Sequence, residues 1–454
     1  MMSSGPGALR VAVVGSGIAG LATAWELSRR GFAVSLIERE AHPGGRTCGE
    51  TVEGFRLDAT GPLVSTGDRR LLAWVDDVGL RSELLPLRPV VTLHWFGRRA
   101  AAIDPQGLRG IARIPGVRPL HALRLLRLPR LIARYGARID PGSPESGADL
   151  DDRSLGDFGR LYFGRSVLAH WMGPIVSETS LGDVDDLSRV LFLRRFRSHG
   201  RERPALLRAA LGELVEAAAA KLPLECGVDA ARIERRADGG LALAVSRGGA
   251  ERVLTPDAVV VATSAADAAR LAAPVLVTAE RDGLAAVGYR PAISLAVGMR
   301  RPFFSQPQHI RIPRTEASPL ESVLLEPGIR GGRVPDGRGL AVLRATGAWS
   351  EANFSAPEEA LRKELLGAFA RIHPGAESAV LFARLFRVER AVPRFDVGRY
   401  RGIACFERVQ RELRREGRRL YFAGDYLMDP SVEGALASAG RAAAAVAEDL
   451  AAVV

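Results

Sequence analysis

The sequence predicts an α/β fold with a parallel sheet, and three observations support this prediction. Residues 11–14 form a run of Val and Ala without a polar residue, which is typical of a buried parallel strand. A glycine turn, a helical segment and a second strand that ends at Glu38 follow directly. Near the other end of the chain, residues 420–425 indicate a further strand that ends in an acidic residue, and an Ala-rich helical segment follows it.

The composition is that of a folded protein. The 454 residues are 47% hydrophobic and 25% charged, which excludes a disordered or fibrous protein and suggests two or three domains. Three scattered cysteines do not suit a disulfide framework or a metal site, so we expect free thiols and no metal. The net charge of +11 accompanies no nucleic-acid-binding motif, so we expect no nucleic acid as a partner. Because the start lacks a signal-peptide pattern and no run is long enough to span a membrane, we expect a cytoplasmic protein.

Each glycine of the turn has its own role. Gly15 suits the tight turn, Gly17 lets a pyrophosphate approach the helix N-terminus, and Gly20 allows close contact between helix and strand. Glu38 lies about 20 residues further on, where a carboxylate accepts hydrogen bonds from a ribose diol. We therefore predict a dinucleotide site, for which NAD and FAD are both candidates. The turn residues expected to contact the cofactor are Gly15, Ser16, Gly17, Ile18, Ala19 and Gly20.

The segment after the second strand favours FAD. It reads His-Pro-Gly-Gly-Arg-Thr at residues 42–47, and an arginine after paired glycines suits a phosphate or the edge of a flavin. With this segment the chain resembles the FAD-dependent superfamily of flavin amine oxidases, protoporphyrinogen oxidases and carotenoid desaturases, whose members continue the dinucleotide turn into Gly-Gly-Arg. Residues 54–62, 257–263 and 420–435 resemble further segments of the same superfamily.

The resemblance implies FAD held without a covalent bond. Asp425 would bind the ribityl and pyrophosphate region, and the helix that begins near Val432 would direct its positive end at the N1–C2=O edge of the flavin. Residues 228–233 would contact the adenine. Cys405 does not match the position of the flavin-linked cysteine of monoamine oxidases, and we expect it to be a buried thiol. Beyond the glycine turn, the implied cofactor-binding residues are Glu38, Arg39, Gly44, Gly45, Arg46, Thr47, Gly61, Pro62, Leu63, Ala230, Thr263, Gly424, Asp425, Val432 and Ala435.

The resemblance also implies a discontinuous domain. Residues 8–85, 205–285 and 415–454 would form a Rossmann-like FAD-binding domain. Residues 86–204 and 286–414 would form an inserted substrate-binding domain of α+β type with a mixed sheet, in which residues 86–150 are helical.

Part of this helical region combines leucines with arginines. The apolar residues at near-helical spacing are Leu120, Leu123, Leu126, Leu131 and Ile132, with Arg124, Arg127, Arg130 and Arg134 among them, and Pro129 should break or kink the helix. A basic amphipathic helix suits an anionic lipid surface, which would place the protein peripherally at the inner face of the cell membrane. A solvated arginine face over a core stripe explains the pattern equally well.

Two segments of the inserted part resemble protoporphyrinogen oxidases. They are residues 158–188 and residues 387–398, although Arg399 stands where that family usually has histidine. Arginine binds carboxylates in a bidentate manner, so the candidate anchors for a porphyrinogen are Arg387, Arg390 and Arg394.

Further candidates for the substrate site come from the same parts of the chain. Ser294 stands near the position where flavin amine oxidases carry a lysine, so amine oxidation lacks its expected residue. The aromatic residues expected to line an apolar cavity between the domains are Trp95, Trp171, Phe303, Phe304, Phe386 and Phe395.

The resemblance therefore predicts an FAD-dependent oxidoreductase of the protoporphyrinogen oxidase type. Hydride would leave an apolar or porphyrinogen-like small molecule for flavin N5, and O2 or another acceptor would reoxidise the flavin. Desaturation of an isoprenoid or another secondary metabolite is an alternative that a cavity without paired cationic groups would favour, and amine oxidation is a third. No catalytic side chain and no oligomeric state follow from the sequence. A flavin-fold protein without catalysis would be distinguished by the lack of flavin absorbance.

Overall fold

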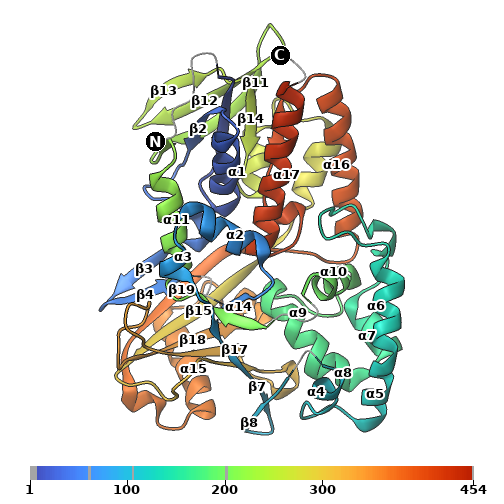
Figure 1. The fold of residues 1–454 in the computed structure, drawn as a ribbon, viewed down its shortest axis with the longest axis vertical. Helices are drawn as coiled ribbons and strands as arrows, with labels where there is room; N and C mark the ends of the chain where they lie inside the picture. Colours follow the sequence, from blue (N-terminus) through green and yellow to red (C-terminus); the bar gives the residue numbers. More distant parts are fainter. Residues whose placement is uncertain (1–7, 60–62, 105–106, 200–202, 452–454) are drawn as a thin grey trace.

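The computed structural model describes residues 8–59, 63–104, 107–199 and 203–451 (Figure 1). The upper part in Figure 1 is built around a five-stranded parallel sheet, and the lower part contains a seven-stranded mixed sheet with a group of helices beside it. The predicted combination of a Rossmann-like α/β domain with a mixed-sheet part is thereby confirmed. The prediction that residues 86–150 are helical is wrong for residues 88–102, which contribute strands to two sheets.

The parallel sheet has helices on one face and a mixture of strands and helices on the other. Its strands, in spatial order, are β10 (Leu224–Glu225), β2 (Ala33–Ile37), β1 (Arg10–Val14), β14 (Ala258–Val261) and β20 (Leu420–Phe422). Val11 and Val13 face one core and Ala12 and Val14 the other, which explains why the strand is apolar throughout.

The first face is covered by four helices, and the second by a small antiparallel sheet and three helices. The helices of the first face are α1 (Ile18–Arg29), α2 (Arg69–Val78), α11 (Leu211–Ala220) and α17 (Val432–Ala451). The second face carries β11 (Asp229–Arg235), β12 (Leu241–Arg247), β13 (Ala250–Leu254), α12 (Ala265–Leu271), α13 (Thr278–Ala285) and α16 (Arg399–Arg415).

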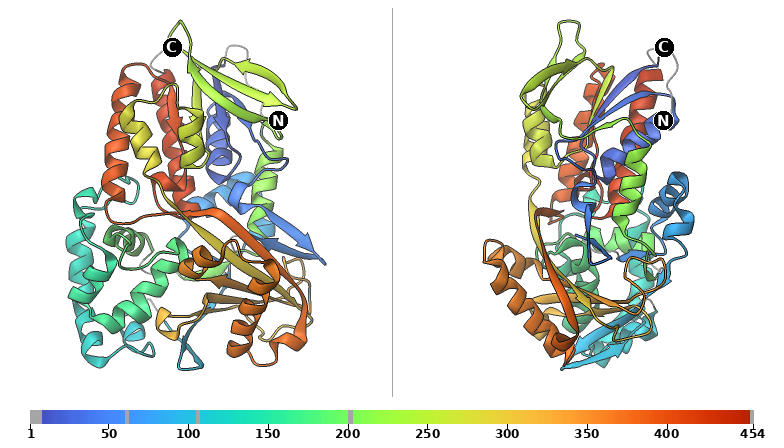
Figure 2. Two further views of the ribbon diagram at one scale, coloured as in Figure 1. Left: turned by 180° about the vertical axis from the view of Figure 1, so that it is seen from behind. Right: turned by 90° about the vertical axis from the view of Figure 1, so that its left-hand side faces the viewer.

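The position of α16 differs from the predicted domain limits. The sequence places residues up to 414 in the substrate part, yet Phe406 packs on Phe422 with ring centroids 5.5 Å apart. Arg441 of α17 lies 3.1 Å from Glu407 of α16, and Figures 1 and 2 both show the two helices side by side. Helix α16 therefore contacts two cores, because Phe406 packs in the second core of the parallel sheet while Tyr400 and Ile403 pack in the core of the helical group.

The mixed sheet is antiparallel except between β16 and β7. Its order is β19 (Val380–Pro393), β15 (Tyr289–Met299), β18 (Gly339–Ala345), β17 (Leu320–Pro327), β16 (Gln308–Arg311), β7 (Val91–Phe96) and β8 (Arg99–Ala102). Helix α15 (Glu358–Ile372) packs on one face through Leu361, Leu365 and Phe369. The longest strands, β15 and β19, extend toward the upper part in both views of Figure 2.

The remaining strands form two small sheets beside these parts. The hairpin β3 (Gly49–Val52) and β4 (Phe55–Asp58) places Phe55 and Leu57 against the mixed sheet. The second small sheet contains β5 (Leu63–Ser65), β9 (Pro204–Leu206) and β6 (Arg88–Pro89).

A group of helices with its own apolar core lies beside the mixed sheet. Trp171 and Phe192 pack at its centre with ring centroids 5.7 Å apart. The helices are α4 (Leu108–Ala112), α5 (Pro119–Arg124), α6 (Leu128–Gly136), α7 (Leu155–Tyr162), α8 (Arg165–Val167), α9 (Gly173–Ser180) and α10 (Arg189–His199). The short helices α3 (Arg81–Leu84) and α14 (Gly347–Asn353) are not part of this helical group.

The leucines of α5 do not form the core stripe that the sequence allows. Pro129 is the second residue of α6, and the helix is interrupted before it by a 3-10 turn at Leu125–Arg127, as a break or kink at this proline predicts. Leu120, Leu123 and Leu126 are 76%, 64% and 68% exposed, whereas Leu131 is buried. Across the four described ranges, no helix combines the length and the apolar character needed to cross a bilayer.

Candidate functional site

One cavity of about 1270 Å³ connects the parallel sheet with the mixed sheet and the helical group. Its walls include the glycine turn, residues 44–48, the start of α17, helices α9 and α10, and strands β16 and β18. Such a cleft at the carboxyl ends of parallel strands is the usual ligand position in open α/β sheets.

The glycine turn is fixed by packing at two positions and open at the third. Gly15 has φ +98°, which favours glycine, and a Cβ on Gly20 would lie 1.7 Å from the Gly15 carbonyl oxygen. A Cβ on Gly17 would meet no protein atom within 4 Å, and Gly17 lines the cavity. The backbone at Gly17 is therefore the point where a phosphate can approach the N-terminus of α1.

Glu38 lies at the cavity beside the turn. Its Oε2 accepts hydrogen bonds from the backbone N–H of Ser16 at 2.7 Å and from the Ser16 hydroxyl at 2.8 Å. The backbone N–H of Val228 donates to the Glu38 carbonyl oxygen at 2.8 Å, which brings Ala230 to the same wall. The carboxylate is thus held where its other lone pairs can accept from a sugar diol.

Arg46 and Asp425 form a bidentate ion pair across the cavity. Both nitrogen–oxygen distances are 2.8 Å, and Arg46 also donates to the Ala391 carbonyl oxygen at 2.8 Å. Burial, followed by the charge of Asp425, raises the pKa of the nearby Tyr289 phenol to about 12, so this phenol stays protonated. The pair ties the 44–48 segment to the start of the C-terminal region.

The N-terminus of α17 faces the same cavity. Val432, Gly434 and Ala435 line it, and the Ser431 hydroxyl accepts a hydrogen bond from the Gly434 N–H at 2.9 Å. This cap leaves the positive end of the helix dipole directed at the cavity.

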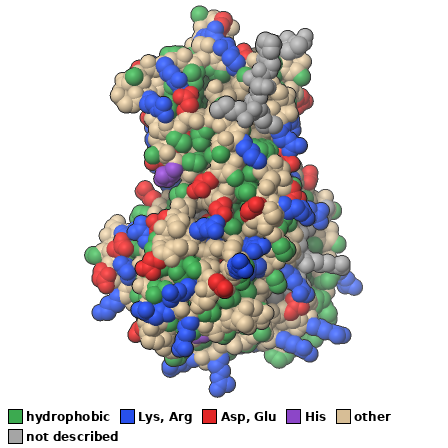
Figure 3. All heavy atoms as spheres, turned by 60° about the vertical axis from the view of Figure 1, so that its left-hand side comes forward, with side chains coloured by type: hydrophobic (Ala, Val, Ile, Leu, Met, Phe, Trp, Pro, Cys, Tyr) green, Lys and Arg blue, Asp and Glu red, His purple; other side chains and the backbone are tan. Residues whose placement is uncertain are grey.

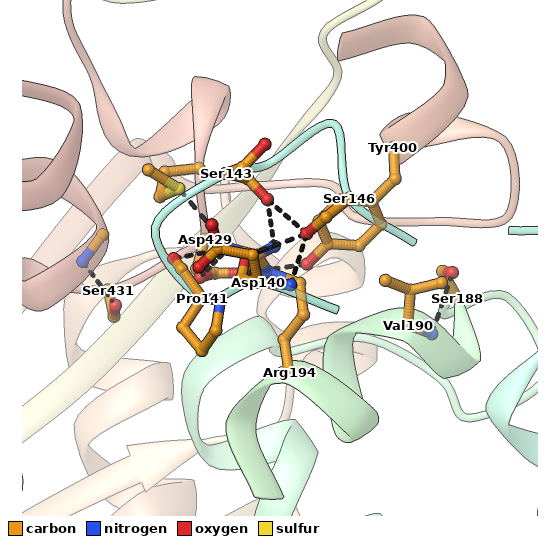
Figure 4. Close-up of polar contacts among 12 residues, drawn as sticks. Asp140, Pro141, Ser143, Ser146, Ser188, Val190, Arg194, Tyr400, Asp429 and Ser431 are labelled. Atoms are coloured by element: carbon orange, nitrogen blue, oxygen red, sulfur yellow. Dashed lines mark hydrogen bonds and ion pairs between the residues drawn. The ribbon is translucent and has the colours of Figure 1, made fainter. Parts of the chain in front are cut away.

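A buried arginine holds the segment that leads into α17. Arg194 of α10 bonds both carboxylate oxygens of Asp429, at 3.1 and 3.3 Å, and its Nη1 donates to the Ser143 carbonyl oxygen at 2.8 Å (Figure 4). The Tyr400 hydroxyl donates to the same carboxylate at 2.8 Å. Arg194 therefore fixes the start of α17 relative to the helical group.

Most predicted cofactor-binding residues lie around the cavity. Ser16 and Gly20 do not line it, because Ser16 is buried beneath Glu38 and Gly20 packs on Gly15. Gly61 and Pro62 lie outside the described residues. Those that line the cavity are Gly15, Gly17, Ile18, Ala19, Glu38, Arg39, Gly44, Gly45, Arg46, Thr47, Leu63, Ala230, Thr263, Gly424, Asp425, Val432 and Ala435.

The predicted substrate residues need correction. Ser294 donates to the Ala59 carbonyl oxygen at 3.2 Å and does not line the cavity. Arg387 is directed to the Phe354 carbonyl oxygen at an exposed position, because its side chain leaves β19 on the outer side. Arg394 likewise lies outside the cavity, 3.6 Å from Glu351.

Two other predicted substrate residues also lie away from the region between α9, α10 and the mixed sheet. Arg390 lines the cavity, but near the glycine turn, where its guanidinium lies 3.1 Å from Asp267. Phe395 is fully buried in the helical core against Tyr400. None of the six aromatic residues proposed as a lining is among the cavity residues, because each packs in a core or on another surface. The cavity contains Phe192 and Phe196 instead.

The charged residues at the far end of the cavity were not among those predicted from the sequence. Arg195, Arg311, Arg344 and Glu178 line this end. Arg311 donates to both carboxylate oxygens of Glu178, at 2.7 and 3.0 Å, and His309 lies 3.3 Å from the same carboxylate. Arg344 within the apolar strand β18 is the signal that could have found this end, because a lone charge in such a strand is rarely buried without a partner.

The protonation states at this end follow from burial and neighbours. Burial alone would raise the pKa of Glu178, but the charge of Arg311 outweighs burial, so the pKa is lowered and Glu178 is ionised. Burial lowers the pKa of His309 to about 4, so the imidazole is neutral near pH 7.

The residues around the glycine turn fit an FAD molecule. An open backbone at a helix N-terminus suits the pyrophosphate, Glu38 suits a ribose, and the N-terminus of α17 suits the electron-rich edge of a flavin. The cavity also continues past these groups toward α9 and α10, which leaves a region for a second molecule.

Comparisons with known proteins agree with this geometry. The family model described as flavin containing amine oxidoreductase matches residues 18–447. Over 181 residues, 39% of this chain and 34% of the relative, the chain is 27% identical to protoporphyrinogen oxidase 2 of Arabidopsis thaliana. It is 42% identical to putrescine oxidase of Kocuria rosea over 152 residues, 32% of this chain and 30% of that enzyme. The match with each of these two relatives covers about a third of the relative's length.

A solved structure extends the similarity to the whole fold. Cyclohexylamine oxidase from Brevibacterium oxydans superposes with a TM-score of 0.72 at 17% identity, covering 98% of this chain and 100% of that structure. At this identity the superposition establishes the shared fold.

Proposed function

The chain belongs to the family of flavin-containing amine oxidoreductases, whose cofactor is FAD, and we propose that it is an FAD-dependent oxidase or dehydrogenase. Its substrate in this proposal is an apolar or porphyrinogen-like small molecule that gives up hydride. The proposed residues for FAD are those listed above around the cavity, and residues 8–85, 205–285 and 415–454, extended by α16, are the proposed FAD-binding domain.

The convergence of Glu38 and Asp425 on one cavity supports this proposal most strongly. The two carboxylates come from opposite ends of the chain. Glu38 follows β2 and Asp425 follows β20, and the parallel sheet places both at the cavity with β1 and β14 between their strands. Between them lie the open backbone of Gly17 and the N-terminus of α17. A surface turn without a ligand would not require this arrangement.

Each of these groups has a defined task. FAD, when bound, supplies hydride acceptance at N5. The turn at residues 15–20 and the N-terminus of α1 bind the pyrophosphate, and Glu38 orients the adenosine ribose. The Arg46–Asp425 pair and the Arg194–Asp429 pair hold the flavin end of the cavity in shape. The apolar side chains of Leu191, Phe192 and Phe196 exclude water from the region beside it.

The character of the substrate region favours a porphyrinogen over the alternatives. Amine oxidation lacks a lysine, because the described lining of the cavity contains none. Desaturation of a neutral isoprenoid is disfavoured by the arginines at the far end, which suit a molecule with carboxylates. A protoporphyrinogen oxidase-like reaction accommodates both observations.

Anaerobic reduction of the bound flavin tests the proposed reaction. The purified flavoprotein is mixed without oxygen with protoporphyrinogen, coproporphyrinogen, a carotenoid precursor or a diamine. We expect a porphyrinogen to bleach the flavin band and the others to leave it unchanged. Bleaching by the diamine or the carotenoid precursor alone would overturn the choice of substrate.

The proposal includes a non-covalent FAD. Cys405 is exposed on α16 and does not line the cavity, which corrects the expected buried thiol. Cys48 does line it, but burial raises the pKa of its thiol, which keeps it in the unreactive form. The electron acceptor in this proposal is O2 or another small oxidant.

Peripheral contact with an anionic membrane is a second, independent part of the proposal. Leu120, Leu123 and Leu126 are exposed on α5 and the turn after it, and Arg124 and Arg127 are their neighbours in the sequence. We expect the protein to sediment with vesicles of phosphatidylglycerol and a variant with serine at the three leucines to remain in solution. Equal sedimentation of the two proteins would contradict membrane contact.

A further inference from the structure

The far end of the cavity holds three arginines from three separate elements. Arg195 comes from α10, Arg311 from β16 and Arg344 from β18, and all three line the same cavity wall as Glu178 of α9. We call these four residues the arginine end of the cavity. Their position beside Phe192 places them next to the apolar region where a substrate would lie.

Two of the three guanidinium groups have no carboxylate partner among the described residues. Arg311 is paired with Glu178. Arg195 instead donates to the Thr179 hydroxyl at 2.9 Å, and Arg344 donates to the Glu178 carbonyl oxygen at 2.9 Å, both of which are neutral acceptors. The buried Glu321 lies near Arg344, and burial raises the pKa of its carboxyl while the charge of Arg344 opposes this rise.

Three buried arginines elsewhere in the chain are each paired with a carboxylate. Arg194 is paired with Asp429, Arg333 with Asp58 and Glu326, and Arg418 with Glu280. Pairing is expected, because a charge withdrawn from water is costly without a partner. Arg195 and Arg344 are half-buried at the cavity wall and donate to neutral acceptors, so the positive charge of the arginine end is directed at the cavity.

We propose that the arginine end binds a carboxylate of the substrate, through Arg195 and Arg344, while Glu178 keeps Arg311 in place behind them. The inference rests on the proposed function and specifies the substrate as an organic acid with an apolar body. Each guanidinium has five N–H groups and uses one in the contacts given above, so both can still form the paired hydrogen bonds that carboxylates accept. The apolar neighbours Ile175, Leu191 and Phe196 suit the body of such an acid.

Binding of an acid and its ester to the oxidised flavoprotein tests this inference without turnover. Coproporphyrin III and its tetramethyl ester are titrated into the holoenzyme, and the change in the flavin spectrum is followed. A charge-assisted contact predicts that the acid binds about 10- to 100-fold more tightly than the ester. Arg195→Gln and Arg344→Gln should each remove most of this preference, Arg195→Lys should retain part of it, and Arg301→Gln, an exposed control, should retain all of it.

The outcomes separate this inference from the proposed function. Equal binding of acid and ester to the unaltered protein, or an unchanged preference in both Gln variants, would overturn the arginine assignment even if a porphyrinogen bleaches the flavin. If the purified protein binds no flavin, the proposed function is overturned instead. Binding of the acid and the ester is then measured by porphyrin fluorescence. FAD content and circular dichroism show whether each variant is folded, and the comparison on the unaltered protein decides the question if both Gln variants fail to fold.

Discussion

The two ends of the cavity hold charge in different ways. At the glycine end, formed by residues 15–20 and Glu38, backbone N–H groups and one carboxylate face the ligand, and neighbouring elements of the parallel sheet fix them. At the arginine end, charged side chains converge from α9, α10, β16 and β18, and positive groups exceed negative ones. The first end is specified by where the backbone runs, whereas the second depends on a balance of buried charges.

The difference teaches which parts of the molecule can change independently. A backbone turn that binds phosphate serves any substrate, because it contacts only the cofactor. The arginine end lies on the other part of the molecule, where basic side chains also project from the lower surface seen in Figure 3. Substrate choice can therefore change through a few side chains while cofactor binding stays the same.

The largest expected effect separates two glycines of the same turn. Gly20→Ala should abolish the folded flavoprotein, because the new methyl group would lie 1.7 Å from the Gly15 carbonyl oxygen. Gly17→Ala places its methyl group in the cavity, so the unfolding temperature of the FAD-free protein should not change, while FAD binding weakens by about tenfold or more. Thermal unfolding and FAD titration measure both effects. Identical behaviour of the two variants would contradict the described roles.

The next effect concerns the arginine end. Glu178→Gln leaves Arg311 buried without its carboxylate, so the free energy of unfolding should fall by about 3–5 kcal/mol. Urea unfolding of the holoenzyme measures the loss. Glu377→Gln, at an exposed position, serves as the control and should change stability by less than about 0.5 kcal/mol. A loss below about 1 kcal/mol for Glu178→Gln would show that this end is not organised by a buried pair.

A smaller effect appears with pH. Burial lowers the pKa of His309 and of His94 to about 4, so between about pH 6.5 and about pH 4 the unfolded chain binds more protons than the folded chain. Stability should therefore fall as the pH falls through this window, by about 1–3 kcal/mol for each histidine. His94→Gln should show a shallower decline between pH 7 and pH 5 in urea midpoints. A decline as steep as in the unaltered protein would assign the acid sensitivity elsewhere.

The smallest effect is expected at a residue that the sequence placed in the substrate site. Arg387 is exposed and bonds the Phe354 carbonyl oxygen, so Arg387→Gln should change stability by less than about 0.5 kcal/mol. Its preference for coproporphyrin III over the tetramethyl ester should equal that of the unaltered protein. Loss of that preference would show that Arg387 on β19 binds the carboxylate of the ligand.

The glycine end was predictable because its contacts are local or follow from a recurrent backbone path. Gly15, Gly17 and Glu38 lie within one strand–helix–strand unit, and the parallel sheet predicted from residues 11–14 brings Asp425 beside them. The arginine end was not predictable in this way. Arg311 stands in the polar strand β16 and Arg344 in the apolar strand β18, and only the pairing of β16, β17 and β18 places them together opposite α9.

The wrong predictions for residues of the substrate-binding part have a similar origin. Arg387 and Arg390 are three residues apart on β19, and a register shift near Arg290 in the neighbouring strand changes which side chains face the cavity. The exposure of Leu120 could not be read from its spacing, because a helix with leucines on one face can turn that face to a core or to the surface. These outcomes depend on contacts between elements far apart in the sequence.

The central claim is that one FAD binds in the cavity between Glu38 and Asp425. This FAD is held without a covalent bond to the protein. The absorbance spectrum of the purified protein, recorded before and after acid precipitation, tests it most directly. We predict a flavin band at about 450 nm and one FAD per chain. After acid precipitation, all of the flavin should be in the supernatant. A colourless protein that takes up no added FAD, or flavin that stays with the precipitate, would contradict the claim.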